Sequence, residues 1–130
     1  MRVLVLVPLL AACSPQAPEP PAERLLYAGE GRDRLCLVGE RGGLITYGDG
    51  DANCSARGRI ERTGERLLLI PDGDPDCRIE ASLTGDRLTL GARTDACAYY
   101  CGPGADFAGK SFSRDGTASP AVDFAGDPLC

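Results

Sequence analysis

The sequence predicts an all-β domain, a small antiparallel meander that curls into a barrel or a two-layer sandwich and is stabilised by disulfides. From about Glu23 onward, Gly and Asp interrupt the chain every eight to twelve residues, with short apolar runs between them. That spacing is typical of strands joined by tight turns. Helical periodicity is missing, because Gly or Pro breaks every candidate apolar stripe. Six cysteines follow the proline-rich start of the chain and supply crosslinks for a core poor in aromatic residues.

Eight strands are expected before residue 101, each bounded by turn residues. They are expected at Arg24–Ala28, Asp33–Val38, Gly43–Tyr47, Cys54–Arg62, Glu65–Pro71, Cys77–Leu83, Arg87–Gly91 and Ala96–Tyr100.

Alternation within these runs predicts which faces are buried. Leu35 and Leu37 precede and follow Cys36 in the sequence, so the two leucines share one face of a strand, as expected for a strand with one buried face. The segments 59–69 and 78–90 both read as strand, Thr-Gly-acid-Arg turn and strand, which predicts two β-hairpins. The run 67–70 is Leu-Leu-Leu-Ile without alternation, and this indicates a strand covered on both faces.

The pattern weakens after Tyr100. A helical turn is expected at 105–108, a last strand at 110–114, and then an irregular tail rich in Gly, Ser, Pro and Asp that ends in Cys130. The tetrapeptide Asp-Phe-Ala-Gly occurs at 106–109 and again at 123–126. This repeat is explained equally well by two similar turns with a buried Phe or by chance.

The N-terminus has the features of an export signal. Met1-Arg2 gives a positive start, the run Val3–Leu10 is apolar but too short to span a bilayer, and Leu10-Ala11-Ala12-Cys13 follows. This stretch resembles the bacterial lipobox, a resemblance that implies cleavage before Cys13 and lipid attachment to its thiol. It also implies sorting to the outer membrane, because Ser14 rather than Asp follows the lipidated cysteine.

Three segments are therefore expected. Residues 1–12 form a lipoprotein signal peptide, residues 13–22 hold the lipidated Cys13 and a proline-rich tether, and residues 23–130 form one small β domain with an irregular tail. The predicted location is the bacterial envelope, anchored to the bilayer through Cys13 and facing the periplasm.

The other six cysteines are candidates for three disulfides in an exported chain. They are Cys36, Cys54, Cys77, Cys97, Cys101 and Cys130. The simplest pairing is Cys36–Cys54, Cys77–Cys97 and Cys101–Cys130, and we expect Cys54, Cys77 and Cys97 to gather near one rim of the meander. A zinc site would have to be all-thiolate, since the chain has no His, and an oxidising compartment disfavours it.

Two acidic loops precede strands and begin like calcium loops, with oxygen ligands at alternate positions. Their candidate ligands are Asp49, Asp51 and Asn53 in the first and Asp72, Asp74 and Asp76 in the second. Both place Cys at the sixth position, where a calcium loop has Gly, and both lack the closing Glu. Plain Asp-Gly turns explain the same residues, and we expect turns without a bound cofactor.

Little in the inventory points to catalysis. Without His there is no ordinary triad, and the only Lys, Lys110, adjoins Ser111, so the two would face opposite sides of a strand. The segment Cys97-Ala-Tyr-Tyr-Cys101 lacks the Cys-x-x-Cys spacing of a redox pair. The stronger interpretation of this segment is a set of structural cysteines with Tyr packed beside them, and the alternative is that Tyr99 and Tyr100 form an exposed recognition patch. We therefore expect a protein that is not an enzyme.

Without Arg2 of the signal, thirteen Lys and Arg residues stand against nineteen Asp and Glu, a net charge near −6. Nucleic acid is excluded as a partner by that sign. In Leu-Ala-Ala-Cys13, the segment 47–54 and the segment 96–104, the chain resembles small uncharacterised Cys-rich lipoproteins of high-GC bacteria. Membrane-bound C-type lysozyme inhibitors are similar in size, anchoring and architecture, but their inhibitory motif is not found here.

Three functions remain open. The favoured one is a non-catalytic binding or structural module of the envelope, with an envelope protein as partner. The alternatives are an inhibitor of a basic secreted hydrolase such as lysozyme and a calcium-binding adhesion or sensing domain.

Overall fold

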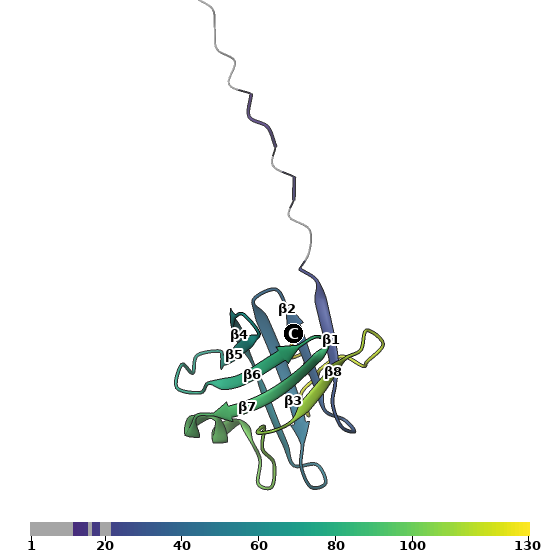
Figure 1. The fold of residues 1–130 in the computed structure, drawn as a ribbon, viewed down its shortest axis with the longest axis vertical. Helices are drawn as coiled ribbons and strands as arrows, with labels where there is room; N and C mark the ends of the chain where they lie inside the picture. Colours follow the sequence, from purple (N-terminus) through teal and green to yellow (C-terminus); the bar gives the residue numbers. More distant parts are fainter. Residues whose placement is uncertain (1–11, 16, 19–21) are drawn as a thin grey trace, which may run out of the picture.

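The computed structural model describes residues 12–15, 17–18 and 22–130. Eight antiparallel strands follow one another as neighbours, and β1 also pairs with β8, so the sheet closes into a barrel (Figure 1). The strands are β1 (Arg24–Ala28), β2 (Arg34–Val38), β3 (Arg41–Tyr47), β4 (Asn53–Thr63), β5 (Arg66–Pro71), β6 (Ile79–Thr84), β7 (Arg87–Arg93) and β8 (Ser111–Arg114). The predicted all-β meander is confirmed, and of the two architectures left open the barrel is correct.

Three of the connections are two-residue turns in which Gly is followed by an acidic residue. They lie between β2 and β3, β4 and β5, and β6 and β7, and their glycines have φ angles of 59°, 60° and 59°. Glycine adopts this positive φ without a steric penalty, and Gly at the first turn position matches the type II′ turn that suits strand twist. The two predicted Thr-Gly-acid-Arg hairpins are among them.

Alternate side chains of each strand point into the barrel and form one apolar core. Its members include Leu35 and Leu37 of β2, Leu88 and Leu90 of β7, and Phe112 of β8. These leucines show the alternation that the sequence predicted. Leu67, Leu69 and Ile70 of β5 are buried, whereas Leu68 is only half-buried, so the strand is covered on both faces for part of its length.

Two predictions of local structure are wrong. Residues 96–100 are not a strand but belong to a 3₁₀ helix, η1 (Asp95–Tyr100). The helical turn expected at 105–108 is absent, and that segment is irregular. The reason lies in two cysteines, Cys97 within η1 and Cys101 directly after it. A compact turn, with the Cys101 N–H donating to the Ala98 carbonyl, lets Cys97 and Cys101 reach partners on two different strand ends.

All six cysteines of the barrel are paired, and the predicted Cys77–Cys97 bridge is present. The other two predicted pairings are wrong, because Cys36 is bonded to Cys130 and Cys54 to Cys101. Cys36 points out of the barrel and Cys54 points into it, and β3 separates their strands. Cys101 instead forms an isolated antiparallel bridge with Cys54, which brings the two sulfurs together.

The C-terminal segment crosses the outer wall of the barrel. Residues 121–130 form a short hairpin, here called the C-terminal hairpin, in which Val122 pairs with Pro128 and the Leu129 N–H donates to the Ala121 carbonyl. Ala121 and Leu129 pack with outward-facing Cys36 and Ile45 in a second apolar cluster. The tail is thus a fixed part of the fold, fastened by Cys36–Cys130.

Residues 1–11, which hold most of the predicted signal peptide, lie outside the described residues. Residues 12–15 are exposed and have no regular secondary structure. In the parts of the chain that the structure describes, no helix has the length and apolar character needed to cross a membrane.

Candidate binding groove on the barrel wall

The barrel interior is filled by its own side chains. The free space among them, between residues such as Leu37, Leu69 and Leu90, is only about 20 Å³. One water needs roughly 10–15 Å³ by the same measure. Eight-stranded barrels are just wide enough for side chains to fill them. The interior of this one has no room for a small-molecule ligand.

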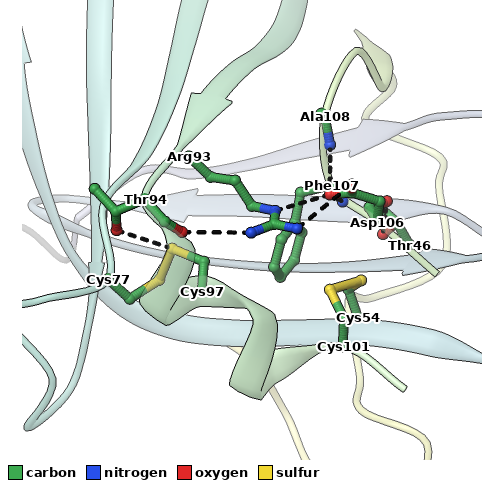
Figure 2. Close-up of polar contacts among 10 residues, drawn as sticks. All are labelled: Thr46, Cys54, Cys77, Arg93, Thr94, Cys97, Cys101, Asp106, Phe107 and Ala108. Carbon is green, nitrogen blue, oxygen red and sulfur yellow. Dashed lines mark hydrogen bonds and ion pairs between the residues drawn. A yellow bond between two sulfur atoms is a disulfide. The ribbon is translucent and has the colours of Figure 1, made fainter. Parts of the chain in front are cut away.

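Phe107 is fully buried and belongs to the core at one end of the barrel, and Figure 2 shows the polar groups beside it. The backbone around it is fixed by Asp106, whose Oδ1 accepts hydrogen bonds from the N–H groups of Phe107 and Ala108. Arg93 lies alongside, with Nε 2.9 Å from Asp106 Oδ1. This hydrogen bond to Arg93 is the main reason that the pKa of Asp106 is lowered, and it raises the pKa of Arg93 in return.

Two disulfides gather at this same end, where η1 connects them (Figure 2). The expected grouping of Cys54, Cys77 and Cys97 is confirmed in this respect. All three are fully buried. Their burial inside the core identifies them as structural crosslinks rather than exchangeable thiols.

The acidic loops make ordinary turns, and the carboxylates of Asp51, Asp72 and Asp74 contact positive or hydroxyl groups of the protein. In the first, Arg32 pairs with Asp51 and donates to the Gly50 carbonyl, while its guanidinium lies 3.9 Å from the centre of the Tyr47 ring. Asn53 donates to the backbone carbonyl of Asp51. Asp49 contributes its backbone carbonyl to the turn.

In the second loop, Arg41 pairs with Asp72, and the Tyr100 hydroxyl donates to Asp74 Oδ2 at 2.9 Å. Asp76 accepts a hydrogen bond from Thr94 through its backbone carbonyl. Within the described part of the chain, no three Cys, Asp or Glu side chains converge as the ligands of a metal ion would.

The Lys110–Ser111 pair is not brought together. The Lys110 ammonium group lies 3.6 Å from the buried carboxylate of Asp33 and donates to the Tyr47 carbonyl. The Ser111 hydroxyl contacts Thr89 on the neighbouring strand. Lys110 therefore compensates a buried charge between the β1–β2 turn and the end of β3.

A large hollow lies on the outer wall, between β4 and β5 on one side and the C-terminal hairpin on the other. We call it the binding groove; its volume is about 650 Å³. It is lined by Ser55, Ala56, Arg57, Pro71, Asp72, Tyr100, Asp123, Asp127, Pro128 and Leu129. Arg57 fixes one edge by donating to the Pro128 carbonyl at 3.2 Å.

Tyr100 forms part of the groove lining and is held in place on both sides. Its ring packs edge-on against Tyr99, with centroids 5.3 Å apart. Burial, together with the hydrogen bond to Asp74, raises the pKa of Tyr100 to about 12. The phenol is therefore a neutral, oriented group at neutral pH.

Three exposed apolar residues adjoin lining residues of this groove in the chain without being part of its lining. In the described part of the chain, the large hydrophobic residues left exposed are Tyr99 at 86%, Phe124 at 62% and Val122 at 37%. Tyr99 contacts a lining residue, and Val122 and Phe124 flank lining residue Asp123 in the hairpin. Exposed apolar groups that gather on one face mark an interaction site more often than isolated ones do.

The sequence pattern singles out some residues of this groove and passes over others. It favours Tyr99 and Tyr100 as packing beside structural cysteines, with a recognition patch as the weaker alternative, and it offers Asp72 and Asp74 as calcium ligands rather than as groove residues. Asp123, Phe124 and Asp127 were not selected, because the tail was expected to be irregular. The repeated Asp-Phe-Ala-Gly is a signal for a second turn there, but its interpretation as two turns with a buried Phe holds for Phe107 and is wrong for Phe124, which is 62% exposed.

Comparisons of the chain with protein-family models, with curated proteins and with solved structures found no match.

Proposed function

We propose that the chain is a lipid-anchored protein of the bacterial envelope whose barrel is a non-catalytic binding or structural domain facing the periplasm. The observation that carries this is the division of the seven cysteines. Six are paired within the barrel, and Cys13 is free and exposed. Three disulfides fit an oxidising compartment. A free cysteine directly after Leu10-Ala11-Ala12 fits lipid attachment at the mature N-terminus.

The membrane affinity expected for this arrangement is high. Each buried methylene of an acyl chain contributes about 0.8 kcal/mol, so several chains on one residue hold a protein at the bilayer without a spanning helix. The proline-rich segment that follows Cys13 suits an extended spacer of about 3 Å per residue.

A binding role is supported by the contrast between the two faces of the barrel wall. Its interior is filled, whereas its exterior has a groove bordered by exposed aromatic residues. A non-catalytic role is supported by the state of the polar groups. Lys110 neutralises Asp33, and Asp72 and Asp106 are paired with arginines.

The anchor is tested by comparing the wild type with Cys13→Ala in a bacterium that processes lipoproteins. The wild type is expected to incorporate labelled fatty acid and to fractionate with membranes, and Cys13→Ala is expected to do neither. Ser14→Asp is the matched variant for sorting, since it keeps Cys13 and is expected to move the protein to the inner membrane. Equal membrane association of the wild type and Cys13→Ala would refute the anchor.

A second candidate function is inhibition of a basic secreted hydrolase such as lysozyme. The carboxylates of the binding groove favour it, because their charge is complementary to that of a basic enzyme. It is tested by titrating the protein into a lysozyme assay, with Asp123→Asn/Asp127→Asn as the variant expected to lose inhibition.

A further inference from the structure

We propose that the binding groove docks a basic segment of a partner protein, in which an Arg or Lys meets Asp123 and Asp127 while neighbouring apolar side chains contact Tyr99 and Phe124. This inference rests on the proposed binding role of the barrel and gives that role a surface and a partner chemistry. The shape of the groove and the exposed apolar groups beside it indicate a docking surface. The charge of the groove then indicates which kind of partner it binds.

Two aromatic side chains beside the groove, Tyr99 and Phe124, are exposed to solvent. Phe107 and Phe124 occupy the same position in two identical tetrapeptides, yet Phe107 is fully buried and Phe124 is 62% exposed. The core explains Phe107 and leaves Phe124 without a packing role. Tyr99 is still more exposed, at 86%. Tyr and other aromatic residues next to a hollow are typical anchors of protein interfaces, since they bury a large area when a partner covers them.

The hairpin that presents Phe124 is rigid. The Asp127 N–H donates to Asp123 Oδ1 at 2.8 Å, and the Asp123 N–H donates to the Asp127 carbonyl at 2.9 Å. The Cys36–Cys130 disulfide fastens the end of the hairpin to β2. A fixed hairpin loses little conformational entropy when a partner binds it.

The charge of the groove selects the partner. Asp72, Asp123 and Asp127 line it, against one cation, Arg57. Asp72 is neutralised by Arg41, whereas among the residues that the structure describes Asp123 and Asp127 form no ion pair. Two unpaired carboxylates attract a guanidinium or ammonium group and repel phosphate and anionic lipid headgroups. A basic protein segment is thus the occupant that satisfies both the carboxylates and the aromatic rings.

The probe is an end-capped peptide of seven residues in which two arginines are separated by two leucines. Its control replaces both arginines by glutamine. Binding is measured by fluorescence anisotropy with the full protein as the cell produces it, in neutral detergent, at low and at physiological salt. We expect the arginine peptide to bind at least about tenfold more tightly than the glutamine peptide, and this difference to shrink as salt rises.

Two variants test the location of the site. Asp123→Asn/Asp127→Asn keeps the shape of both side chains and an oxygen acceptor for the hairpin, and is expected to weaken arginine-peptide binding about tenfold. Phe124→Ala is expected to weaken both peptides, because it removes an apolar contact. The matched control is Glu30→Gln/Asp86→Asn, which changes the net charge equally at two exposed turns outside the groove and is expected to bind normally.

Several outcomes would overturn the proposal. They are the absence of arginine-peptide binding, equal binding of the two peptides, or equal weakening by the groove variant and the Glu30/Asp86 control. Self-association that depends on Asp123 and Asp127 in sedimentation would replace the partner by a second copy of this chain. Lipidation of Cys13 is measured separately from peptide binding. A negative peptide result therefore does not affect the proposed lipid anchor, and absence of lipidation does not affect the peptide-binding proposal.

Discussion

Phe107 and Phe124 provide an internal comparison for the stability of the barrel, because each is the second residue of the same tetrapeptide, Asp-Phe-Ala-Gly. Phe107→Ala removes a fully buried ring from the end of the core. An aromatic side chain buries at least about 150 Å², which at about 25 cal/mol per Å² corresponds to about 4 kcal/mol. Measured Phe→Ala changes in protein cores cost about 3–5 kcal/mol. We therefore expect Phe107→Ala to lower the free energy of unfolding by that amount.

The assay is urea unfolding with the disulfides intact, followed by circular dichroism, together with thermal melting. For a domain of about a hundred residues, each kcal/mol moves the melting temperature by about 4 °C or more, so the shift is expected to be at least about 12 °C. Phe124→Ala changes an exposed ring with no core contact, and its effect is expected to stay within about 0.5 kcal/mol. Equal losses in the two variants, or a loss below about 1 kcal/mol for Phe107→Ala, would refute the assignment of Phe107 as the end of the core.

Three further predictions concern the charged and phenolic groups. In an ultraviolet titration, Tyr100 is expected to ionise near pH 12 in the wild type and at a lower pH in Asp74→Asn. Because an unfolded Tyr ionises at about pH 10, the stability that the raised Tyr100 pKa contributes is present below about pH 10 and is lost as the pH rises toward 12. Because the pKa of Asp106 is lowered, its ionised carboxylate contributes stability above the ordinary carboxyl range, and that stability is lost as the pH falls through the lowered pKa. The hydrogen bond from Arg93 is the main cause of the lowered pKa, so an NMR titration of Arg93→Gln is expected to show a higher Asp106 pKa. Millimolar calcium is expected to leave the melting temperature unchanged, and a rise of several degrees that Asp49→Ala or Asp72→Ala abolishes would contradict the description of both loops as turns.

Local signals made most of the barrel predictable. The Gly-acid turns and the alternation of Leu35 and Leu37 depend only on neighbours in the sequence, and the strands lie where these signals placed them. Closure was not predictable in the same way. It depends on β1 meeting β8, where Tyr27 pairs with Arg114 across most of the chain. No local pattern separates that closure from a two-layer sandwich.

The alternation of side chains along β2 bears on the pairing of Cys36. The alternation that buries Leu35 and Leu37 turns Cys36 outward, which excludes a bridge to inward-facing Cys54. The outer wall then offers Cys36 only a segment that crosses it, and the tail ending in Cys130 is such a segment. The 3₁₀ helix at 95–100 was harder to predict, because its cause is the position of Cys54 and Cys77 on distant strand ends.

The sequence indicates some of the groove residues but not those of the tail, because the tail reaches the groove only through a contact between residues far apart in the chain. Tyr99, Tyr100 and Asp72 attracted attention through local composition. Asp123 and Asp127 become groove residues only when the tail is fastened to β2, a contact between residues 94 positions apart. The repeated tetrapeptide indicated a second turn in the tail but not where it would lie.

The C-terminal hairpin also makes the groove dependent on one glycine. A Cβ at Gly43 of β3 would overlap the carbonyl oxygen of Leu129, so the hairpin lies directly against the strand. Since that neighbour is backbone rather than a flexible side chain, Gly43→Ala must displace the hairpin. The barrel core lies on the other face of β3, where Leu44 points inward, and it is expected to keep its packing.

Gly43→Ala is therefore expected to weaken arginine-peptide binding at least about tenfold while the near-ultraviolet circular dichroism of the barrel is retained. Hydrogen exchange of the Leu129 amide, which donates to the Ala121 carbonyl, should become faster in the same variant. Cys36→Ser/Cys130→Ser is expected to behave alike, because the disulfide and the close contact at Gly43 hold the same segment. Unchanged peptide binding in both variants would mean that the groove does not need the hairpin. In that case Asp123, Phe124 and Asp127 would not be its binding residues.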